Sequence, residues 1–345
     1  MADPGELITE QHRLGQVNIS AGASRAVLDR WRQVSPTNLQ ETSASWLADS
    51  LALNRTYRRR SRVLTAAYVR LLRAFRTGRT LPPMTGPAEA ETSLGELRQQ
   101  FASAVGAHRR HAADDSTTVS VDEDFAWPDV DDEAEDRRAA VSLIVTGPVR
   151  AQRGIDALQG ERGRLDDADF LADLDSIMRD AGALTAGAAD RDALMGGRDL
   201  LDQSSRADRA VIGWARVTDS DPCHFCALLA SRGAVYRSQW TARYTGRTGR
   251  RARTVTRPDG MDDWSPGRLA SWEAAQGLDR YHDNCHCTIV PVYSRTDWLP
   301  EASRAFRELY DLSTDGLSGD DARRAFRRAI EARRRLAVAR GVSVR

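Results

Sequence analysis

The sequence predicts an α+β protein that is mostly α-helical, with a helical N-terminal region, a small α+β module and a basic C-terminal helix. Three observations support this fold class. Apolar residues recur at helical spacing on both sides of an acidic stretch. Short β-branched runs that are typical of strands appear from about residue 211. All four cysteines lie in two clusters beside those runs, at 223–226 and 285–287.

Residues 1–113 form the predicted helical N-terminal region. Its clearest helix carries six apolar residues on one stripe, spaced i, i+3, i+4, i+7, i+8 and i+11: Leu64, Ala67, Tyr68, Leu71, Leu72 and Phe75. Gly78 and the proline pair that follows it predict the end of this helix. A second helix is predicted to begin at Ser93, because Glu96 three residues later completes a capping box.

The segment 114–136 is strongly acidic and contains no basic residue. Such a charge run is usually a solvated linker. Phe125 and Trp127 in its middle point instead to a docking segment, whose aromatic side chains anchor it on a partner or on the chain's own domain. The sequence leaves both interpretations open.

Helical patterning resumes over 137–210. One apolar face is marked by Phe170, Leu174 and Ile177, and three acidic residues occupy the first turn, where they favour the helix dipole: Asp166, Asp167 and Asp169. Gly196 and Gly197 predict a turn between two helices. Three histidines in polar surroundings are expected at the surface: His12, His108 and His111.

Residues 211–300 form the predicted α+β module. The runs 211–219 and 288–294 are typical of strands, and Pro291 restricts the second run to a sheet edge. Between them lies a polar excursion over 237–280, rich in arginine and glycine. Residues 301–345 return to helix and end in a basic tail.

The cysteine pattern is C-x-x-C, then about 55 residues, then H-x-x-C-x-C. A C-x-x-C turn presents two thiolates on one side, as a tetrahedral zinc ion requires, and two ligands from the second cluster would close the shell. The candidate ligands are Cys223, Cys226, His282, Cys285 and Cys287. Four cysteines, or three together with His282, satisfy the chemistry equally well. A closed site of this kind is structural, so the zinc would pin the base of the excursion and give a zinc-pinned α+β module.

Three other interpretations of the cysteines remain. A C-x-x-C pair at a helix start is also a redox motif, although no βαβ pattern surrounds this one. The thiols could form disulfides in an assembled particle outside the cell. A Cys-His protease could use Cys223 or Cys285, although no third orienting group is recognisable.

Composition places the chain among globular proteins, with 41% hydrophobic and 29% charged residues and a formal net charge of +1. No apolar run is long enough to cross a bilayer and no secretory signal is recognisable, so synthesis in the cytosol without a membrane partner is expected. No nucleotide-binding, zinc-protease or serine-hydrolase motif is found, and no small-molecule substrate is evident.

All fifty basic residues are arginines, and six of them lie on the excursion without an intervening acid: Arg243, Arg247, Arg250, Arg251, Arg253 and Arg257. Arginines on a glycine-containing loop can neutralise nucleic-acid phosphates without sequence preference. The same loop could equally pair with the acidic 114–136 segment of its own or a neighbouring subunit.

The stretches "IGWARVTDSDPCHFCALLASRGAVY" and "YHDNCHCTIVPVY" resemble the MuF-like head-morphogenesis, or minor capsid, proteins of tailed bacteriophages, especially those of actinobacteria. That family carries a C-x-x-C pair followed by a motif close to H-P-x-C-R-C. Cys223, Cys226, His282, Cys285 and Cys287 match its motif positions. Asp283 stands where proline is usual, and His286 stands where arginine is usual and becomes a further possible ligand.

The resemblance implies a virion component made in the host cytoplasm, located in the capsid interior or at the portal vertex. Its implied partners are the portal, the major capsid protein and packaged DNA, and its implied role is in head assembly, genome packaging or ejection. We therefore expect a structural protein rather than an enzyme. The alternatives are a cysteine-dependent capsid maturation protease, a C-x-x-C thiol oxidoreductase, and an effector delivered from the head.

Overall fold

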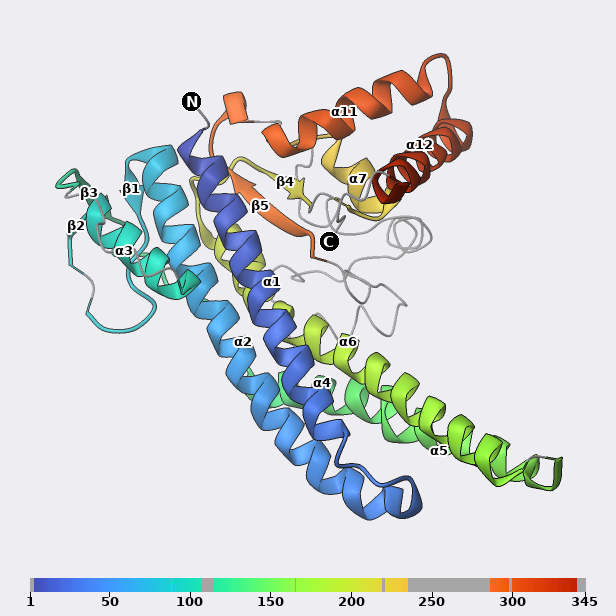
Figure 1. The fold of residues 1–345 in the computed structure, drawn as a ribbon. Helices are drawn as coiled ribbons and strands as arrows, with labels where there is room; N and C mark the ends of the chain where they lie inside the picture. Colours follow the sequence, from blue (N-terminus) through green and yellow to red (C-terminus); the bar gives the residue numbers. More distant parts are fainter. Residues whose placement is uncertain are drawn as a thin grey trace, which may run out of the picture.

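Three long helices frame the molecule in the computed structural model, which describes residues 3–87, 89–106, 115–164, 166–218, 221–234, 286–297 and 300–339. They are α1 (Pro4–Trp31), α2 (Leu39–Thr77) and α6 (Asp167–Ala207), and each packs against the other two (Figure 1). The short η1 turn (Pro36–Asn38) joins α1 to α2. Asp3 and Asp166 cap the N-termini of α1 and α6, and Gly78 ends α2 at a φ of 71°.

The centre of this bundle is polar and closely packed. His12 and Gln16 of α1 bond to the Thr65 hydroxyl of α2 at 3.1 and 2.9 Å, and the Ser61 hydroxyl accepts the backbone N–H of Gly197 at 2.9 Å. The predicted surface position of His12 is therefore wrong, because its ring is only 2% exposed. Polar neighbours in the sequence did not reveal that tertiary packing covers this side chain.

The predicted turn at Gly196 and Gly197 is also wrong, because both glycines lie inside α6. A Cβ at Gly196 would meet the Arg58 carbonyl oxygen at 2.7 Å, and one at Gly197 would meet the Ser61 hydroxyl at 2.5 Å. The two glycines allow α6 to approach the backbone of α2 closely. The sequence alone does not distinguish this role of glycine from a turn.

Two shorter helices, α4 (Asp132–Thr146) and α5 (Pro148–Gly160), pack against α6, and the η2 turn (Arg162–Arg164) leads from α5 toward α6. Their apolar residues join a second core, formed with the ends of α1 and α2 around Trp31, Trp46, Leu143, Ile155 and Ala188. The distal ends of α5 and α6 extend away from the α1–α2 hairpin (Figure 1).

The acidic segment docks on its own chain. Strand β3 (Thr118–Val121) pairs with β1 (Arg79–Thr80) in parallel and with β2 (Glu91–Ser93) in antiparallel orientation, and α3 (Leu94–Val105) follows β2. Phe125 and Trp127 contact each other edge to face at 5.4 Å and pack against a first apolar core, formed mainly by α2 and α3 around Leu64, Tyr68 and Phe101. The Trp127 indole donates to the Pro82 carbonyl at 3.0 Å. The capping box of Ser93 and Glu96 is present, as predicted.

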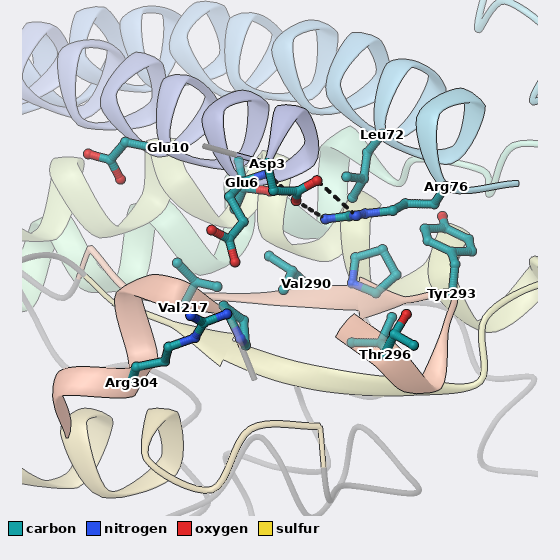
Figure 2. A pocket seen from close by; sticks show the side chains of 14 residues that line it. Asp3, Glu6, Glu10, Leu72, Arg76, Val217, Val290, Tyr293, Thr296 and Arg304 are labelled. Atoms are coloured by element: carbon teal, nitrogen blue, oxygen red, sulfur yellow. Dashed lines mark hydrogen bonds and ion pairs between the residues drawn. The ribbon is translucent and has the colours of Figure 1, made fainter. Parts of the chain in front are cut away.

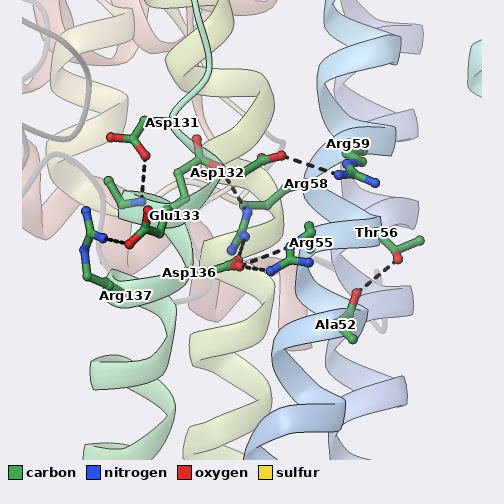
Figure 3. Close-up of polar contacts among 12 residues, drawn as sticks. Ala52, Arg55, Thr56, Arg58, Arg59, Asp131, Asp132, Glu133, Asp136 and Arg137 are labelled. Atoms are coloured by element: carbon green, nitrogen blue, oxygen red, sulfur yellow. Dashed lines mark hydrogen bonds and ion pairs between the residues drawn. The ribbon is translucent and has the colours of Figure 1, made fainter.

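The end of this segment also binds arginines of α2 (Figure 3). Arg58 is 1% exposed and contacts Glu135 at 3.0 Å, Asp192 at 2.7 Å and also Asp136. Arg55 bonds to Asp136 as well. Removing one partner from such a buried network leaves an uncompensated charge, so these contacts fix α4 on α2. The solvated-linker interpretation therefore does not describe residues 115–136.

The rest of the described chain forms a smaller α+β layer (Figure 1). Strands β4 (Gly213–Val217) and β5 (Thr288–Val292) pair antiparallel, with Trp214 opposite Pro291, so Pro291 lies on an edge strand as predicted. The short η4 turn (Arg295–Asp297) follows β5. Helices α7 (His224–Ala230), α11 (Glu301–Thr314) and α12 (Gly319–Ala339) share a core of Ala227, Ala230, Phe306, Phe326 and Ile330.

The predicted fold class is confirmed: the protein is mostly helical with small sheets. The domain boundaries proposed from the sequence stay predictions. Within the described ranges, no helix combines the length and apolar character that a membrane span requires.

Candidate functional site

The register of the β4–β5 pair separates two faces. Ala215, Val217, Val290 and Val292 form one apolar face. Arg216 lies opposite Ile289 and belongs to the other face, on which Ile289 packs with Leu229 of α7. Cys287 precedes Ile289 by two positions, and side chains alternate along a strand, so Cys287 is directed to the α7 side as well.

Three cysteines gather on that side. Cys223 is the N-cap residue of α7, and its sulfur accepts the backbone N–H of Cys226 at 3.4 Å. Cys226 and Cys287 are 4% and 2% exposed and pack together with the half-buried Cys223. The fold thus joins the two cysteine clusters that lie far apart in the sequence.

Arginines from two elements support this cysteine cluster, which consists of Cys223, Cys226 and Cys287. The buried Arg216 of β4 donates from Nη2 to the Cys226 sulfur at 3.5 Å. Arg198 of α6 donates from Nη2 to the Cys287 carbonyl at 2.9 Å. These residues were missed in the sequence, although an arginine inside the apolar run "GWARV" is a signal that a buried charge partner exists.

Three of the candidate zinc ligands, from two segments of the chain, pack together: Cys223, Cys226 and Cys287. Cys285 and His282 fall outside the described residues, so the structure does not show the complete set of candidate ligands. Over the described part of the chain, no group of three or more potential ligands is arranged to hold a metal ion. His286 lies with Nε2 3.7 Å from Asp190 Oδ1, in contact with α6. Zinc binding therefore stays a prediction.

The same geometry bears on the alternative uses of cysteine. No disulfide joins Cys223, Cys226 and Cys287 to one another. Cys226 and Cys287 are too deeply buried to attack a macromolecular substrate without a structural change. Cys223 is the more accessible thiol, and its position at a helix start is the one that a redox interpretation requires.

Residues 167–313 match a family described as "VG15 protein". The match indicates a phage protein. It covers α6, the β4–β5 pair, α7 and nearly all of α11, and therefore includes both cysteine clusters and the arginine-rich excursion. Comparison with curated proteins and with solved structures found no significant match.

The six excursion arginines of this VG15-like region lie outside the described residues, and so do His108 and His111. The predicted contacts of Arg243, Arg247, Arg250, Arg251, Arg253 and Arg257 with nucleic acid consequently stay predictions.

A cavity of about 330 Å³ lies between the apolar face of the β4–β5 pair and the ends of α1 and α2 (Figure 2). Val217 and Val290 line its sheet side. Arg76 contacts Asp3 with Nη1 3.2 Å from Oδ1, and Glu6 accepts the backbone N–H of Glu301 at 2.6 Å. These wall contacts tie α1 to α2 and to α11, so the cavity marks the junction of the bundle with the β4–β5 pair and α11.

Proposed function

We propose that this protein is a structural component of a tailed-phage head, of the MuF-like minor capsid class, that acts near the portal during head assembly, genome packaging or ejection. The observation that carries the proposal is the VG15 match over residues 167–313, which includes both cysteine clusters. The resemblance of "DPCHFC" and "YHDNCHC" to the MuF-like motif adds the finer assignment.

In this proposal the α1–α2–α6 bundle is the rigid part, and the β4–β5 pair with α7 and the excursion is the presenting part. Cys223, Cys226 and Cys287, with Cys285 or His282, would hold a structural zinc ion that cross-links the two ends of the excursion. Closing a loop of more than forty residues costs conformational entropy, and a metal clip at its base offsets that cost. The excursion arginines would then face DNA phosphates in the packaged head.

The direct test is the protein inventory of purified virions. Quantitative mass spectrometry is expected to find this chain in few copies relative to the major capsid protein. Particles that lack the chain are expected to show defects in head assembly, DNA content or ejection. Virions that never contain it would contradict the proposal, and normal infectious particles from a deletion mutant would contradict the assigned role.

The arginine-rich excursion can be tested separately. Replacing its six arginines with serine is expected to reduce DNA packaging or retention while the protein still enters the particle. A charge-matched control replaces six exposed arginines outside the excursion. Unchanged DNA content in the excursion variant would remove DNA contact from the proposal and leave the structural role standing.

The cysteine-enzyme alternative deserves its own test because Cys223 lies half-buried at a helix start. Cys223→Ser is expected to lower the metal content of the reduced protein and the stability of the VG15-like region together. A variant that folds normally but no longer supports cleavage of a head protein would favour the protease. A variant that folds normally but loses thiol–disulfide exchange would favour the oxidoreductase.

A further inference from the structure

Helix α12 presents an exposed basic face. Seven arginines and three acidic residues lie within Gly319–Ala339. Ala322, Phe326 and Ile330 are buried on the opposite side, against α11 and α7. Arg324, Arg328 and Arg335 are exposed and spaced i, i+4 and i+11, which places them within about 40° of arc on one helix. We call these three residues the basic stripe.

The distal half of α6 presents an exposed acidic face. Residues 166–180 contain six aspartates and one arginine. Asp169, Asp173 and Asp180 are exposed and have the same i, i+4, i+11 spacing, so they also form one line, the acidic stripe. Phe170, Leu174 and Ile177 turn to the less exposed side, where Ile177 lies close to Gly154 of α5.

The two stripes do not meet within one chain. The distal end of α6 and helix α12 lie at separate ends of the molecule (Figure 1). Among the described residues, Arg328, Arg335 and the three aspartates make no ion pair, and Arg324 has only an exposed contact with Asp321 at 2.6 Å. No other element in the described part of the chain pairs with either stripe, so both face away from the rest of that part.

The geometry points to a second copy of this chain as the occupant: the acidic stripe of one copy binds the basic stripe of the next. Each stripe spans about 16 Å of helix, so three ion pairs can form at once. A parallel alignment sets Ser176 opposite Glu331, whereas an antiparallel one sets Asp173 opposite Glu331, with like charges. Over the three stripe positions the parallel alignment is favoured, because it forms three opposite-charge pairs and the antiparallel alignment forms two. Outside the stripes the parallel alignment sets Asp166 opposite Asp321 and Arg179 opposite Arg334, with like charges.

Because the two faces differ, the contact is heterologous and joins copies head to tail, which produces rings or helical filaments rather than closed two-fold dimers. Exposed ion pairs are weak individually, so the association is expected to depend on concentration and to weaken strongly with salt. This inference does not depend on the metal site or on the proposed function.

The test is sedimentation velocity of the full chain over a concentration series, in about 0.05 M and about 1 M NaCl, where screening differs greatly. Association is expected at low salt and monomers at high salt. A wild-type chain that stays monomeric at every concentration at low salt overturns the inference. If that monomer instead binds duplex DNA through α12, the basic stripe is a binding surface for polyanions and not for a second copy.

Charge reversal sharpens the test. Asp169→Arg, Asp173→Arg and Asp180→Arg together, or Arg324→Glu, Arg328→Glu and Arg335→Glu together, are each expected to raise the dissociation constant at least tenfold. A mixture of the two triple variants is expected to associate again, because each then supplies a stripe complementary to the other. No association in the mixture, with both variants folded by circular dichroism, overturns the inference.

A charge-matched control reverses exposed acids on the far α1–α2 end: Asp29, Glu41 and Asp49 to arginine. This control changes net charge as the acidic-stripe variant does and is expected to keep wild-type association. A loss of association equal to that of the stripe variant would show that only net charge matters, which also overturns the assignment.

Discussion

His12 is a titratable side chain enclosed by the bundle. It stacks on Tyr68 with ring centroids 4.1 Å apart and contacts the Thr65 hydroxyl at 3.1 Å. Burial lowers the pKa of His12 from 6.5 to about 3, because a charged imidazolium would lose its hydration there. The folded protein therefore holds this ring neutral over most of the acidic range.

Replacing this histidine is expected to change how stability depends on pH. The unfolded chain binds a proton at His12 below pH 6.5, whereas the folded chain binds it only near pH 3, so stability is lost as pH falls through this window. At pH 5 the loss attributable to His12 is about 2 kcal/mol. Denaturant unfolding of His12→Gln across pH should lack this component, and a difference curve that is flat between pH 7.5 and pH 4 would contradict the assignment.

Arg216 is the residue whose burial links the sheet to the cysteine cluster. Its guanidinium donates to the Cys226 sulfur, so Arg216→Met removes a charge-assisted donor from a buried sulfur. We expect a loss of about 1–3 kcal/mol in the stability of the VG15-like region, measured by hydrogen exchange of β4 and α7 amides. The control Arg232→Gln removes an exposed arginine after α7 and should change stability by less than about 0.5 kcal/mol. Equal effects of the two changes would contradict a special role for Arg216.

At the scale of elements, the close approach of α6 to α1 and α2 depends on small residues. Gly182 lies against Trp31, and Gly196 and Gly197 lie against α2. Leucine-rich helices could not approach so closely. The buried polar bonds around Ser61 and Thr65 then hold the helices in one register, since a shift would leave these groups without partners.

Gly196→Ala is expected to destabilise the bundle by about 1–3 kcal/mol, because the new methyl group would meet the backbone of Arg58 and force the helices apart. The matched change Gly160→Ala at the end of α5 adds a methyl group with nothing within 4 Å and is expected to be neutral or slightly stabilising. Thermal unfolding of both variants checks this. Similar midpoints would show that α6 and α2 adjust without cost.

At the scale of the whole molecule, two parts that are stabilised in different ways meet at the cavity. The bundle is held by long helices, buried arginine–carboxylate contacts and two apolar cores. The VG15-like strands and α7 have small cores around a cysteine cluster. A structural metal would therefore contribute most to the second part.

Metal removal is consequently expected to act locally. In hydrogen-exchange mass spectrometry of the reduced protein, a strong chelator should reduce protection in β4, α7 and β5 and leave the centre of α2 unchanged. Metal analysis before treatment should give about one zinc per chain. Protein that contains no metal, or protection that is insensitive to chelation, would contradict the zinc site and direct attention to a reactive Cys223.

The sequence by itself determined the features that rest on short-range chemistry: the helical class, the Ser93 capping box, the Gly78 stop, the β4–β5 strands and the edge position of Pro291. Each depends on neighbours a few residues away, so local spacing is sufficient. The sequence also predicted that the two cysteine clusters lie close together, because a tetrahedral zinc ion would need ligands from both.

Only the tertiary structure decided which polar residues are buried. His12, Arg58 and Arg198 lie in sequence contexts that suit a solvated surface, and each has a hydrogen-bond partner between 53 and 134 residues away. The role of the glycine pair in α6 and the docking of the acidic segment were also decided only by the tertiary structure. Burial of a polar group is a property of the packed helices and sheets around it, and no local pattern encodes which distant segment will supply its hydrogen bond.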